Sequence, residues 1–413
     1  MSAPSTPATG NYFNRLDAIR GLAILWVLVY HTGGACWGWD VSQWQAAAAG
    51  WPTWLAIPGQ LGARLLGMGG LGVPIFFVLS GFLIHYTYSR SSDPRISTFW
   101  WRRWWRICPP YLAALVAFAL WGGFFWHARG RQDFFYHLLL IHNFNDRTFF
   151  SINGSFWSLA HEWQFYALYP LLLVVRRRIG MRTVLGIALF ARLAISAWLM
   201  LQGTRYAKDP SILLMLPRLY FEWILGMYVA DCFLQNRRAL AGPWWSGWLC
   251  VAYAAFASGR GWWDLGVIPA ISLATAFWIE QIIHHRRPAH RLEQWLMPLG
   301  VISYSMYLWH QPIVNQIVRH VLDSPRGLAA VGSGGLVATG FALSALAAVI
   351  VAVGSYQLFE LPSIEYVKRR SKARPPSNSG DSTSPPTVGR DLRVDRPHGA
   401  QSPTVKEAAV PAK

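Results

Sequence analysis

Apolar stretches long enough to cross a lipid bilayer recur along most of this 413-residue sequence. A membrane-spanning helix needs about 20 mostly apolar residues, and a window of that length finds ten candidate spans. Only 14% of the residues are charged, whereas ordinary soluble domains have about 25%. The sequence therefore predicts an all-α, polytopic membrane helix bundle rather than a soluble globule or a disordered chain. The predicted spans lie near residues 18–38, 66–88, 108–127, 155–175, 183–202, 211–233, 243–258, 264–283, 296–318 and 332–360.

The basic residues predict how these spans are oriented. The net charge is +18, but Lys and Arg lie in short clusters between apolar segments, which is typical of membrane topology rather than of a nucleic-acid surface. With the N-terminus in the cytoplasm, the inside connections carry 16 Lys and Arg without the C-terminal tail, and the outside connections carry 9. This excess follows the positive-inside rule. We therefore expect both termini to be cytoplasmic, in a multi-pass protein of the cell (inner) membrane with no nucleic-acid partner.

Composition divides the sequence into three regions. Residues 1–12 are predicted to be disordered, residues 13–367 to form the membrane-embedded domain, and residues 368–413 to form a basic, Pro/Ser-rich, disordered cytoplasmic tail. The tail has almost no large apolar side chain that would offset the entropy of ordering. The four cysteines form no C-x-x-C pair, and no metal site is expected.

Ionisable residues inside apolar spans mark candidate functional sites, because such groups are costly in lipid. In the first span, Arg20 and His31 are eleven residues apart, which is three helical turns plus about 20°. Both side chains are therefore expected on one helix face, about 16 Å apart along the axis. The alternative is that Arg20 anchors the topology and that His31 is an interfacial residue.

A segment rich in Trp and Arg, residues 98–106, precedes the third predicted span. Arg103 and Arg106 are three residues apart, so on a helix they point the same way. Paired guanidinium groups among indoles suit a phosphorylated, ring-bearing ligand such as the nucleotide end of coenzyme A. Taken alone, the segment is more simply interpreted as an interfacial amphipathic helix.

A carboxylate lies near the head of the fourth predicted span. Ser158 and Glu162 are four residues apart and share a helix face, and the 13 residues after Glu162 carry no charge. An Arg or His of another span is the expected partner, and a structural ion pair between helices is the alternative. The segment 302–312 places hydroxyl groups and the imidazole of His310 in the membrane, and as an isolated feature it favours packing contacts over catalysis.

Together these segments resemble the acyltransferase-3 family of integral membrane O-acyltransferases, in order over about residues 12–365. The similarity begins with Leu-Asp-x-x-Arg-Gly-x-Ala and its Arg-x10-His spacing, and continues with Gly-Val-Pro-Ile-Phe-Phe-Val-Leu-Ser-Gly-Phe-Leu-Ile at 72–84. An Arg-x-x-Arg pair before Pro-Tyr, a Trp-Ser-Leu-x-x-Glu block and Ser-Tyr-Ser-x-Tyr-Leu-x-His follow. Because only the basic tail follows the last span, the sequence resembles the stand-alone form of the family, without the C-terminal hydrolase-like domain of many relatives.

The resemblance implies an O-acyltransferase that moves an acyl group, most often acetyl, from acyl-CoA to a hydroxyl group. The implied acceptor is a carbohydrate or glycosylated molecule, such as an envelope polysaccharide, lipopolysaccharide or lipo-oligosaccharide. We expect His31 to be the general base for the acceptor hydroxyl, and Glu162 to orient an imidazole or relay a proton. Arg20 would stabilise negative charge on the donor or the oxyanion. Arg103 and Arg106 would hold the donor's phosphates.

Two other functions are left open by the sequence. A transporter or flippase for a glycan or small molecule would also have buried Arg, His and Glu, although inverted repeats that would favour transport are not apparent. Acylation of a non-sugar secondary metabolite such as a macrolide is the second alternative.

Overall fold

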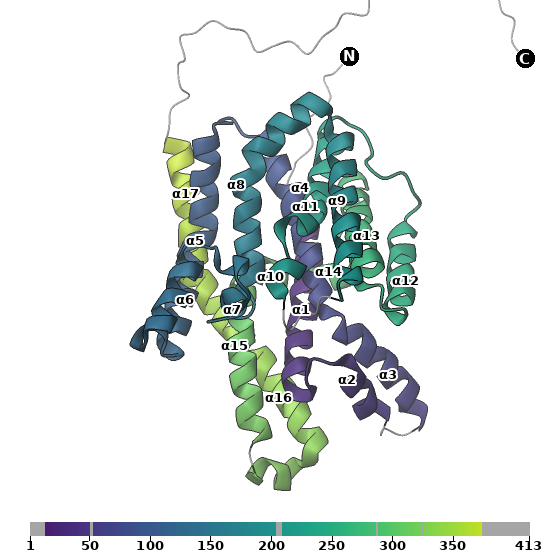
Figure 1. Cartoon of the computed structure of the whole chain (residues 1–413), viewed down its shortest axis with the longest axis vertical. Coiled ribbons are helices and arrows are strands. Elements are labelled where there is room, and N and C mark those ends of the chain that lie inside the picture. The colour runs from purple at the N-terminus through teal and green to yellow at the C-terminus, as the bar shows by residue number, and fades with distance from the viewer. Residues whose placement is uncertain (1–12, 50–52, 204–208, 286–287, 324, 374–413) are drawn as a thin grey trace, which may run out of the picture. The chain divides into compact units, whose positions relative to one another are not determined.

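The structure is a computed structural model that describes residues 13–49, 53–203, 209–285, 288–323 and 325–373 (Figure 1). All regular elements among these residues are helices, which confirms the predicted all-α class. The α-helices are α1 Phe13–Trp37, α2 Val41–Ala49, α3 Thr53–Gly67, α4 Gly72–Ser89, α5 Ile96–Trp121, α6 Ala128–Leu138, α7 Asp146–Phe149, α8 Phe156–Ile179, α9 Met181–Leu201, α10 Pro210–Leu213, α11 Leu216–Leu234, α12 Ser246–Gly259, α13 Ile268–His284, α14 Arg291–Val301, α15 Ser303–Leu322, α16 Pro325–Ser355 and α17 Leu361–Ala373. Short helices are η1 Gly69–Leu71, η2 Phe124–Trp126, η3 His142–Phe144, and the π-helices η4 Trp263–Val267 and η5 Tyr356–Glu360.

Six helical segments among the described residues are long and apolar enough to cross a membrane, so the chain is a multi-pass membrane protein. They correspond to six of the ten predicted spans. The other four predicted spans fall on α5, α8, α12 and, for 296–318, on α15 together with the end of α14. Helix α12 has only 14 residues, and the other three carry arginine or glutamate side chains within their apolar sequence. The six segments are Phe13–Trp37, Gly59–Ser89, Met181–Leu201, Pro210–Leu234, Trp263–His284 and Leu336–Arg370.

Two predicted boundaries are wrong. The Trp- and Arg-rich segment 98–106 is not separate from the span that follows, because α5 runs unbroken through Pro109 and Pro110. The predicted span 296–318 is instead two helices, α14 and α15, which are separated at Ile302. The first difference places Arg103 and Arg106 on the same rigid helix as the span itself.

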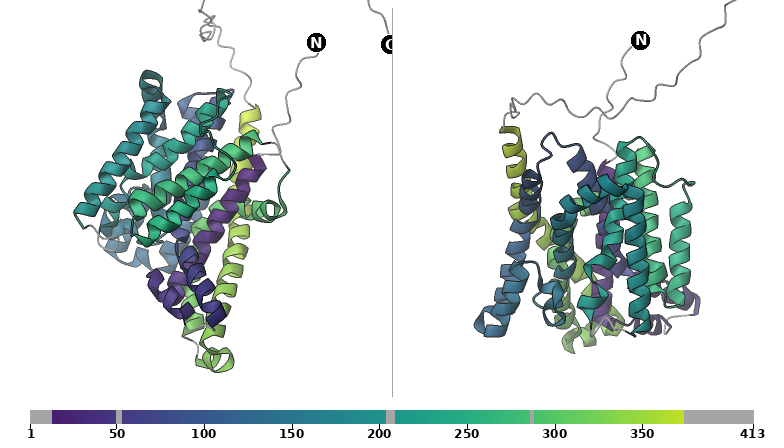
Figure 2. Two further views of the ribbon diagram at one scale, coloured as in Figure 1. Left: turned by 90° about the vertical axis from the view of Figure 1, so that its right-hand side faces the viewer. Right: turned by 45° about the horizontal axis from the view of Figure 1, so that its top comes forward.

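Two compact units divide the chain after Lys368. In the first unit most of the long helices run in a similar direction, and the α2–α3 pair projects near the end of α1 (Figure 2). Of the second unit the structure describes only residues 369–373, which complete α17. The segment 1–12 and the part of the predicted tail beyond residue 373 lie outside the described residues.

Glycine residues allow two pairs of helices to approach closely. A Cβ at Gly81 of α4 would collide with the carbonyl oxygen of Trp223 in α11, and a Cβ at Gly226 of α11 would collide with the carbonyl oxygen of Val78 in α4. The α1–α14 contact uses Gly21 and Gly300 in the same reciprocal way. Small residues at helix crossings are typical of membrane proteins, where close packing drives association.

Buried ion pairs hold a second group of helices together. Arg192 of α9 pairs with Glu222 of α11 at 2.9 Å, and all of this pair is buried. Arg218 of α11 pairs with Asp264 of η4 at 3.0 Å, and Arg192 also donates to the carbonyl oxygens of Arg218 and Asp264. Each of these four charges therefore has an opposite charge beside it, as the cost of burying an unpaired charge requires.

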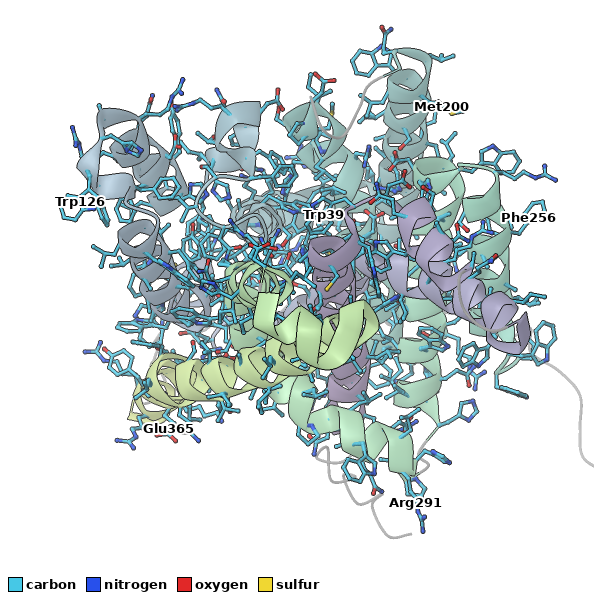
Figure 3. All side chains as sticks on the ribbon, turned by 90° about the horizontal axis from the view of Figure 1, so that it is seen from below. Trp39, Trp126, Met200, Phe256, Arg291 and Glu365 are labelled. Atoms are coloured by element: carbon cyan, nitrogen blue, oxygen red, sulfur yellow. The ribbon has the colours of Figure 1, made fainter. Side chains whose placement is uncertain are left out.

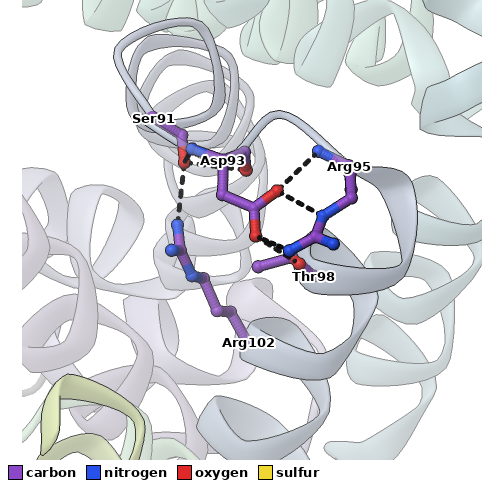
Figure 4. A network of polar contacts seen from close by, with 5 residues as sticks. All are labelled: Ser91, Asp93, Arg95, Thr98 and Arg102. Carbon is purple, nitrogen blue, oxygen red and sulfur yellow. Dashed lines mark hydrogen bonds and ion pairs between the residues drawn. The ribbon is translucent and has the colours of Figure 1, made fainter. Parts of the chain in front are cut away.

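A polar network fixes the start of α5 (Figure 4). Arg95 donates two hydrogen bonds to the carboxylate of Asp93, at 2.8 and 2.7 Å, and the hydroxyl of Thr98 donates a third at 2.9 Å. Arg102 donates to the hydroxyl of Ser91 at 2.9 Å. The hydrogen bonds from Arg95, above all, hold the pKa of Asp93 well below its usual range. This network sets the position from which α5 enters the bundle.

The α4–α11 crossing gives a direct test of the packing. Gly81→Ala should lower the free energy of unfolding by about 1–3 kcal/mol or more, because the added methyl group meets backbone rather than a flexible side chain. Thermal unfolding in detergent measures the effect. Gly186→Ala in α9 is the matched control, because a Cβ there meets no atom within 4 Å. Equal melting temperatures for the two variants would contradict the close crossing.

The Asp93 network predicts a pH dependence. Because the pKa of Asp93 is lowered in the folded protein, its contribution to stability is complete above the ordinary aspartate pKa and is lost as pH falls through the lower folded value. Asp93→Asn should therefore melt at a lower temperature than the wild type at neutral pH. The difference should shrink as the pH is lowered below about 4. A difference that does not change with pH would show that the carboxylate's charge is not what stabilises the turn.

Candidate active site

A pocket lies between helices α1, α4, α5, α8 and α15, and about 870 Å³ of its space, part of it open to the surroundings, is not filled by atoms. Four of the five residues singled out in the sequence line it, namely Arg20, Arg103, Arg106 and Glu162. These side chains come from three helices that are far apart in the sequence, and the fold brings them to one cavity.

Glu162 is fixed by hydroxyl groups rather than by an arginine. Ser80 of α4 donates to its Oε1 at 2.8 Å, and Tyr166, one turn further along α8, donates to the same oxygen. The indole of Trp223 donates to Ser80 at 3.3 Å. Oε2 of Glu162 makes no hydrogen bond to any described residue, which leaves one carboxylate oxygen to face the pocket.

The three arginines of the pocket have different partners. Arg20 lies 3.4 Å from Asp17, one turn earlier in α1. Arg106 pairs with Glu360 of η5 at 3.0 Å. Arg103 donates to the hydroxyl of Thr87 at 3.0 Å and lies over the ring of Phe99 at 5.8 Å. The pocket therefore presents positive charge on its α1 and α5 sides and one carboxylate on its α8 side.

His31 does not line this pocket. Its ring contacts the ring of His310 in α15, with the centroids 4.8 Å apart and the planes at 72°. Its Nδ1 is buried and has no hydrogen-bond partner among the described residues. The sequence suggested an Arg or His of another span as the partner of Glu162, but its hydrogen bonds among the described residues come from Ser80 and Tyr166.

Polar side chains link the pocket to the two histidines. The hydroxyls of Ser158 and Tyr307, which both line the pocket, share a hydrogen bond of 2.6 Å. One turn beyond Tyr307, Nδ1 of His310 donates to the Tyr307 carbonyl oxygen at 2.9 Å. Because a carbonyl only accepts, this contact leaves Nε2 of a neutral His310 as its basic nitrogen. Nε2 lies 3.5 Å from the Ser155 hydroxyl.

Aromatic side chains cover the histidines at the far end of α1. Trp39 contacts His31 with the ring centroids 5.4 Å apart, and half of its surface is exposed. It packs on Gly34, where a Cβ would collide with the indole. Figure 3 looks onto this end of the bundle and shows Trp39 near the middle, with Trp126, Met200 and Phe256 toward the rim. His31 therefore lies just beneath an exposed aromatic surface.

Several polar residues of the site were missed by sequence reasoning. Ser80 lies in the quoted motif at 72–84 and Tyr166 lies one turn beyond the Trp-Ser-Leu-x-x-Glu block, but nothing in the sequence pairs them with Glu162. His310 was interpreted as a packing residue, and the structure places it against His31. Glu360 was interpreted only as the end of the last span. No group of three or more His, Cys, Asp or Glu side chains that would hold a metal ion occurs within the described part of the chain.

The chain belongs to the acyltransferase-3 family, because the family model of this acyltransferase domain matches residues 13–356. That range includes every pocket arginine, Glu162 and both histidines described above. It ends just before Glu360. No solved structure matches the chain significantly.

Curated relatives include bacterial and animal proteins. Peptidoglycan O-acetyltransferase OatA of Listeria monocytogenes is 25% identical over 355 residues, which cover 75% of this chain and 51% of that protein. O-acetyltransferase OatA of Staphylococcus aureus is 26% identical over 356 residues, covering 73% and 51%. Nose resistant to fluoxetine protein 6 of Caenorhabditis elegans is 25% identical over 247 residues, covering 54% and 29%. The chain spans about half the length of the bacterial relatives that it matches.

The charge of the pocket predicts how thiol reagents react within it. In a variant whose four native cysteines are replaced, Leu83→Cys places a thiol on the pocket wall. A methanethiosulfonate carrying a sulfonate should modify this thiol about tenfold faster or more than one carrying a trimethylammonium group, because the nearby arginines attract the anion. The preference should weaken at high salt.

Arg103→Gln in the same background is the control for the reagents' own reactivities. Removing this charge should reduce the preference for the anionic reagent, and mass spectrometry of the labelled protein measures both rates. If the ratio of the anionic to the cationic modification rate is the same with Arg103 and with Arg103→Gln, this arginine does not set the potential in the pocket.

Proposed function

We propose that the protein is an integral membrane O-acyltransferase that moves an acyl group, acetyl in chemical class, from acyl-CoA to a hydroxyl group of a carbohydrate. The observation that carries this proposal is an arginine-lined pocket next to a histidine pair: Tyr307 lines the pocket, its carbonyl oxygen accepts a hydrogen bond from His310, and His310 contacts His31. Membership of the acyltransferase-3 family supports the reaction class.

The donor is assigned to the arginine side of the pocket. Arg103 and Arg106 both line this side, and a guanidinium group suits the phosphates of acyl-CoA because it binds phosphate through charge-assisted hydrogen bonds. The thioester of acyl-CoA stands at the end of a long flexible arm, so its phosphates and its reacting carbonyl need not occupy the same part of the site. Arg20 would stabilise negative charge on the donor or on the oxyanion.

The histidine pair is assigned to the transfer step. The acceptor's hydroxyl oxygen attacks the thioester carbonyl carbon, the carbon–sulfur bond breaks, and an ester and a free thiol form. His31 takes the hydroxyl proton as general base, and the departing sulfur receives a proton in return. Glu162 is held by Ser80 and Tyr166, and it would exchange a proton on the pocket side through its second oxygen. No metal is needed for this chemistry.

The membrane topology follows the charge distribution. We propose ten spanning helices with both termini cytoplasmic, in the inner membrane. In this orientation Arg103 and Arg106 lie in the cytoplasmic half of α5, whereas His31 lies about 16 Å further across the membrane than Arg20. The donor would then enter from the cytoplasm, where acyl-CoA is made, and the acceptor hydroxyl would meet His31 from the other side.

The acceptor is assigned to the carbohydrates. Two bacterial relatives are named for O-acetyl transfer, one of them to peptidoglycan, and cell-envelope glycans are the corresponding class of acceptor for this chain. The exposed face of Trp39 beside His31 provides an aromatic surface on which a sugar ring would stack. Envelope polysaccharide, lipopolysaccharide and lipo-oligosaccharide are the acceptors to be compared.

Acyl-CoA turnover by the purified protein tests the function. Wild-type protein should release free thiol from acetyl-CoA when a suitable glycan is present, and His31→Ala should lower the rate by about 100-fold or more, because a general base contributes about 10²–10⁴ to the rate. The product ester is identified by mass spectrometry.

His320→Ala is the matched control, since His320 is an exposed histidine near the end of α15. It should turn over like the wild type. Normal turnover by a folded His31→Ala variant would end the assignment of His31 as the base. If the wild type releases no thiol with any of the glycans, the chain does not perform this transfer, and the transport function becomes the better interpretation.

A further inference from the structure

The two arginines of the Arg-x-x-Arg pair lie on one helix and line one pocket, but their surroundings differ. Arg106 has a carboxylate partner, Glu360, at 3.0 Å. Among the described residues Arg103 has no carboxylate within ion-pair distance, and its polar contact is the hydroxyl of Thr87 at 3.0 Å. Its Nε is buried without a hydrogen-bond partner. The two arginines are equivalent in the Arg-x-x-Arg motif, but in the structure they have different partners.

Glu360 is fully buried, with 0% of its side chain exposed. Its Oε2 accepts a hydrogen bond of 2.7 Å from the hydroxyl of Ser305 in α15, and its Oε1 faces Arg106. Glu360 is the last residue of the π-helix η5, which joins α16 to α17. A π-turn adds a residue to the helical repeat and is often found at functional sites, and this one places the carboxylate against α5 and α15.

The energetics of burial make this pair hard to separate. An isolated carboxylate in a low-dielectric interior is strongly destabilised, and removing one member of a buried pair leaves the other uncompensated. Glu360 therefore holds Arg106 in place at the pocket wall. Arg103, whose charge has no such partner, is the guanidinium group available to an anion that enters the pocket.

We propose that Glu360 is a positioning residue that restrains Arg106, and that Arg103 is the arginine that binds the anionic end of the donor. This division of roles rests on the proposed function only for the identity of the anion, a phosphate of acyl-CoA. The ion pair and its effect on the pocket are independent of that function.

Three variants separate the two arginines. Arg103→Gln should raise the donor KM and the Kd for coenzyme A by about tenfold or more, the usual effect of losing one charge-assisted hydrogen bond. The acceptor KM and the melting temperature should stay near the wild-type values. Arg106→Lys, which keeps the charge beside Glu360, should change the donor KM by less than about threefold. Arg103→Lys should raise it by more, because Lys cannot reproduce the planar fork of Arg.

A suppressor experiment tests the restraint itself. In the Arg103→Gln background, Glu360→Gln removes the charge that holds Arg106, so Arg106 becomes able to bind the donor. The double variant should therefore bind coenzyme A several-fold more tightly than Arg103→Gln alone. A residue that only stabilised the fold would not restore binding in this way. Calorimetric titration of coenzyme A into the detergent-solubilised full chain measures the affinities without requiring turnover.

Each outcome decides one part of the proposal. If folded Arg106→Lys weakens donor binding as much as Arg103→Lys does, Arg106 is itself a donor ligand and the division of roles is wrong. If the double variant binds coenzyme A no better than Arg103→Gln, Glu360 does not restrain Arg106. If wild-type protein binds no coenzyme A, the proposed donor is wrong. The ion pair is then still tested by the melting temperature, which Arg106→Met should lower and Arg106→Met with Glu360→Leu should restore.

Discussion

A charged side chain among apolar helices needs a partner, and most of this structure depends on that requirement. The pairs of Arg192 with Glu222 and of Arg218 with Asp264 each join elements that are distant in the sequence. None of these charges is compensated until the helices have come together, so the ion pairs specify which helices are neighbours. The glycine crossings also select neighbouring helices, because Gly81 and Gly226 let the backbones of α4 and α11 come into direct contact. Charge pairing and close packing together select one arrangement of the bundle.

The pairing is incomplete at the pocket. The Nε of Arg103 and the second oxygen of Glu162 lack hydrogen-bond partners among the described residues, and both residues line the pocket. The Nδ1 of His31, outside the pocket, also lacks one among the described residues. Unsatisfied polar groups are costly inside a membrane protein, so a polar ligand in the pocket would offset the cost at Arg103 and Glu162.

How much of this was predictable differs between residues. Arg103, Arg106 and Glu162 were identifiable because a charge inside an apolar stretch is conspicuous and helical spacing fixes which charges share a face. The partner of Arg106 was not identifiable, because Glu360 lies 254 positions away along the chain and belongs to a π-turn, which changes the helical register. The break at Ile302 was missed for a different reason: a hydropathy window does not separate two apolar helices that follow each other directly. Local periodicity predicted the elements, and contacts between distant segments decided the site.

The separation of His31 from the arginines follows from what a membrane transferase has to do. A charged donor is soluble on the aqueous side, whereas a glycan of the cell envelope is presented at the opposite face. Under the proposed function, the donor's phosphates and the base would be held at different places, and His31 lies outside the pocket that Arg103 lines. The hydroxyls of Ser158 and Tyr307 share a hydrogen bond in the wall of that pocket. Excluding water from the reacting atoms would protect the thioester from hydrolysis. The separation of about 16 Å between Arg20 and His31 along α1 would then let donor and acceptor approach the reacting atoms from opposite faces.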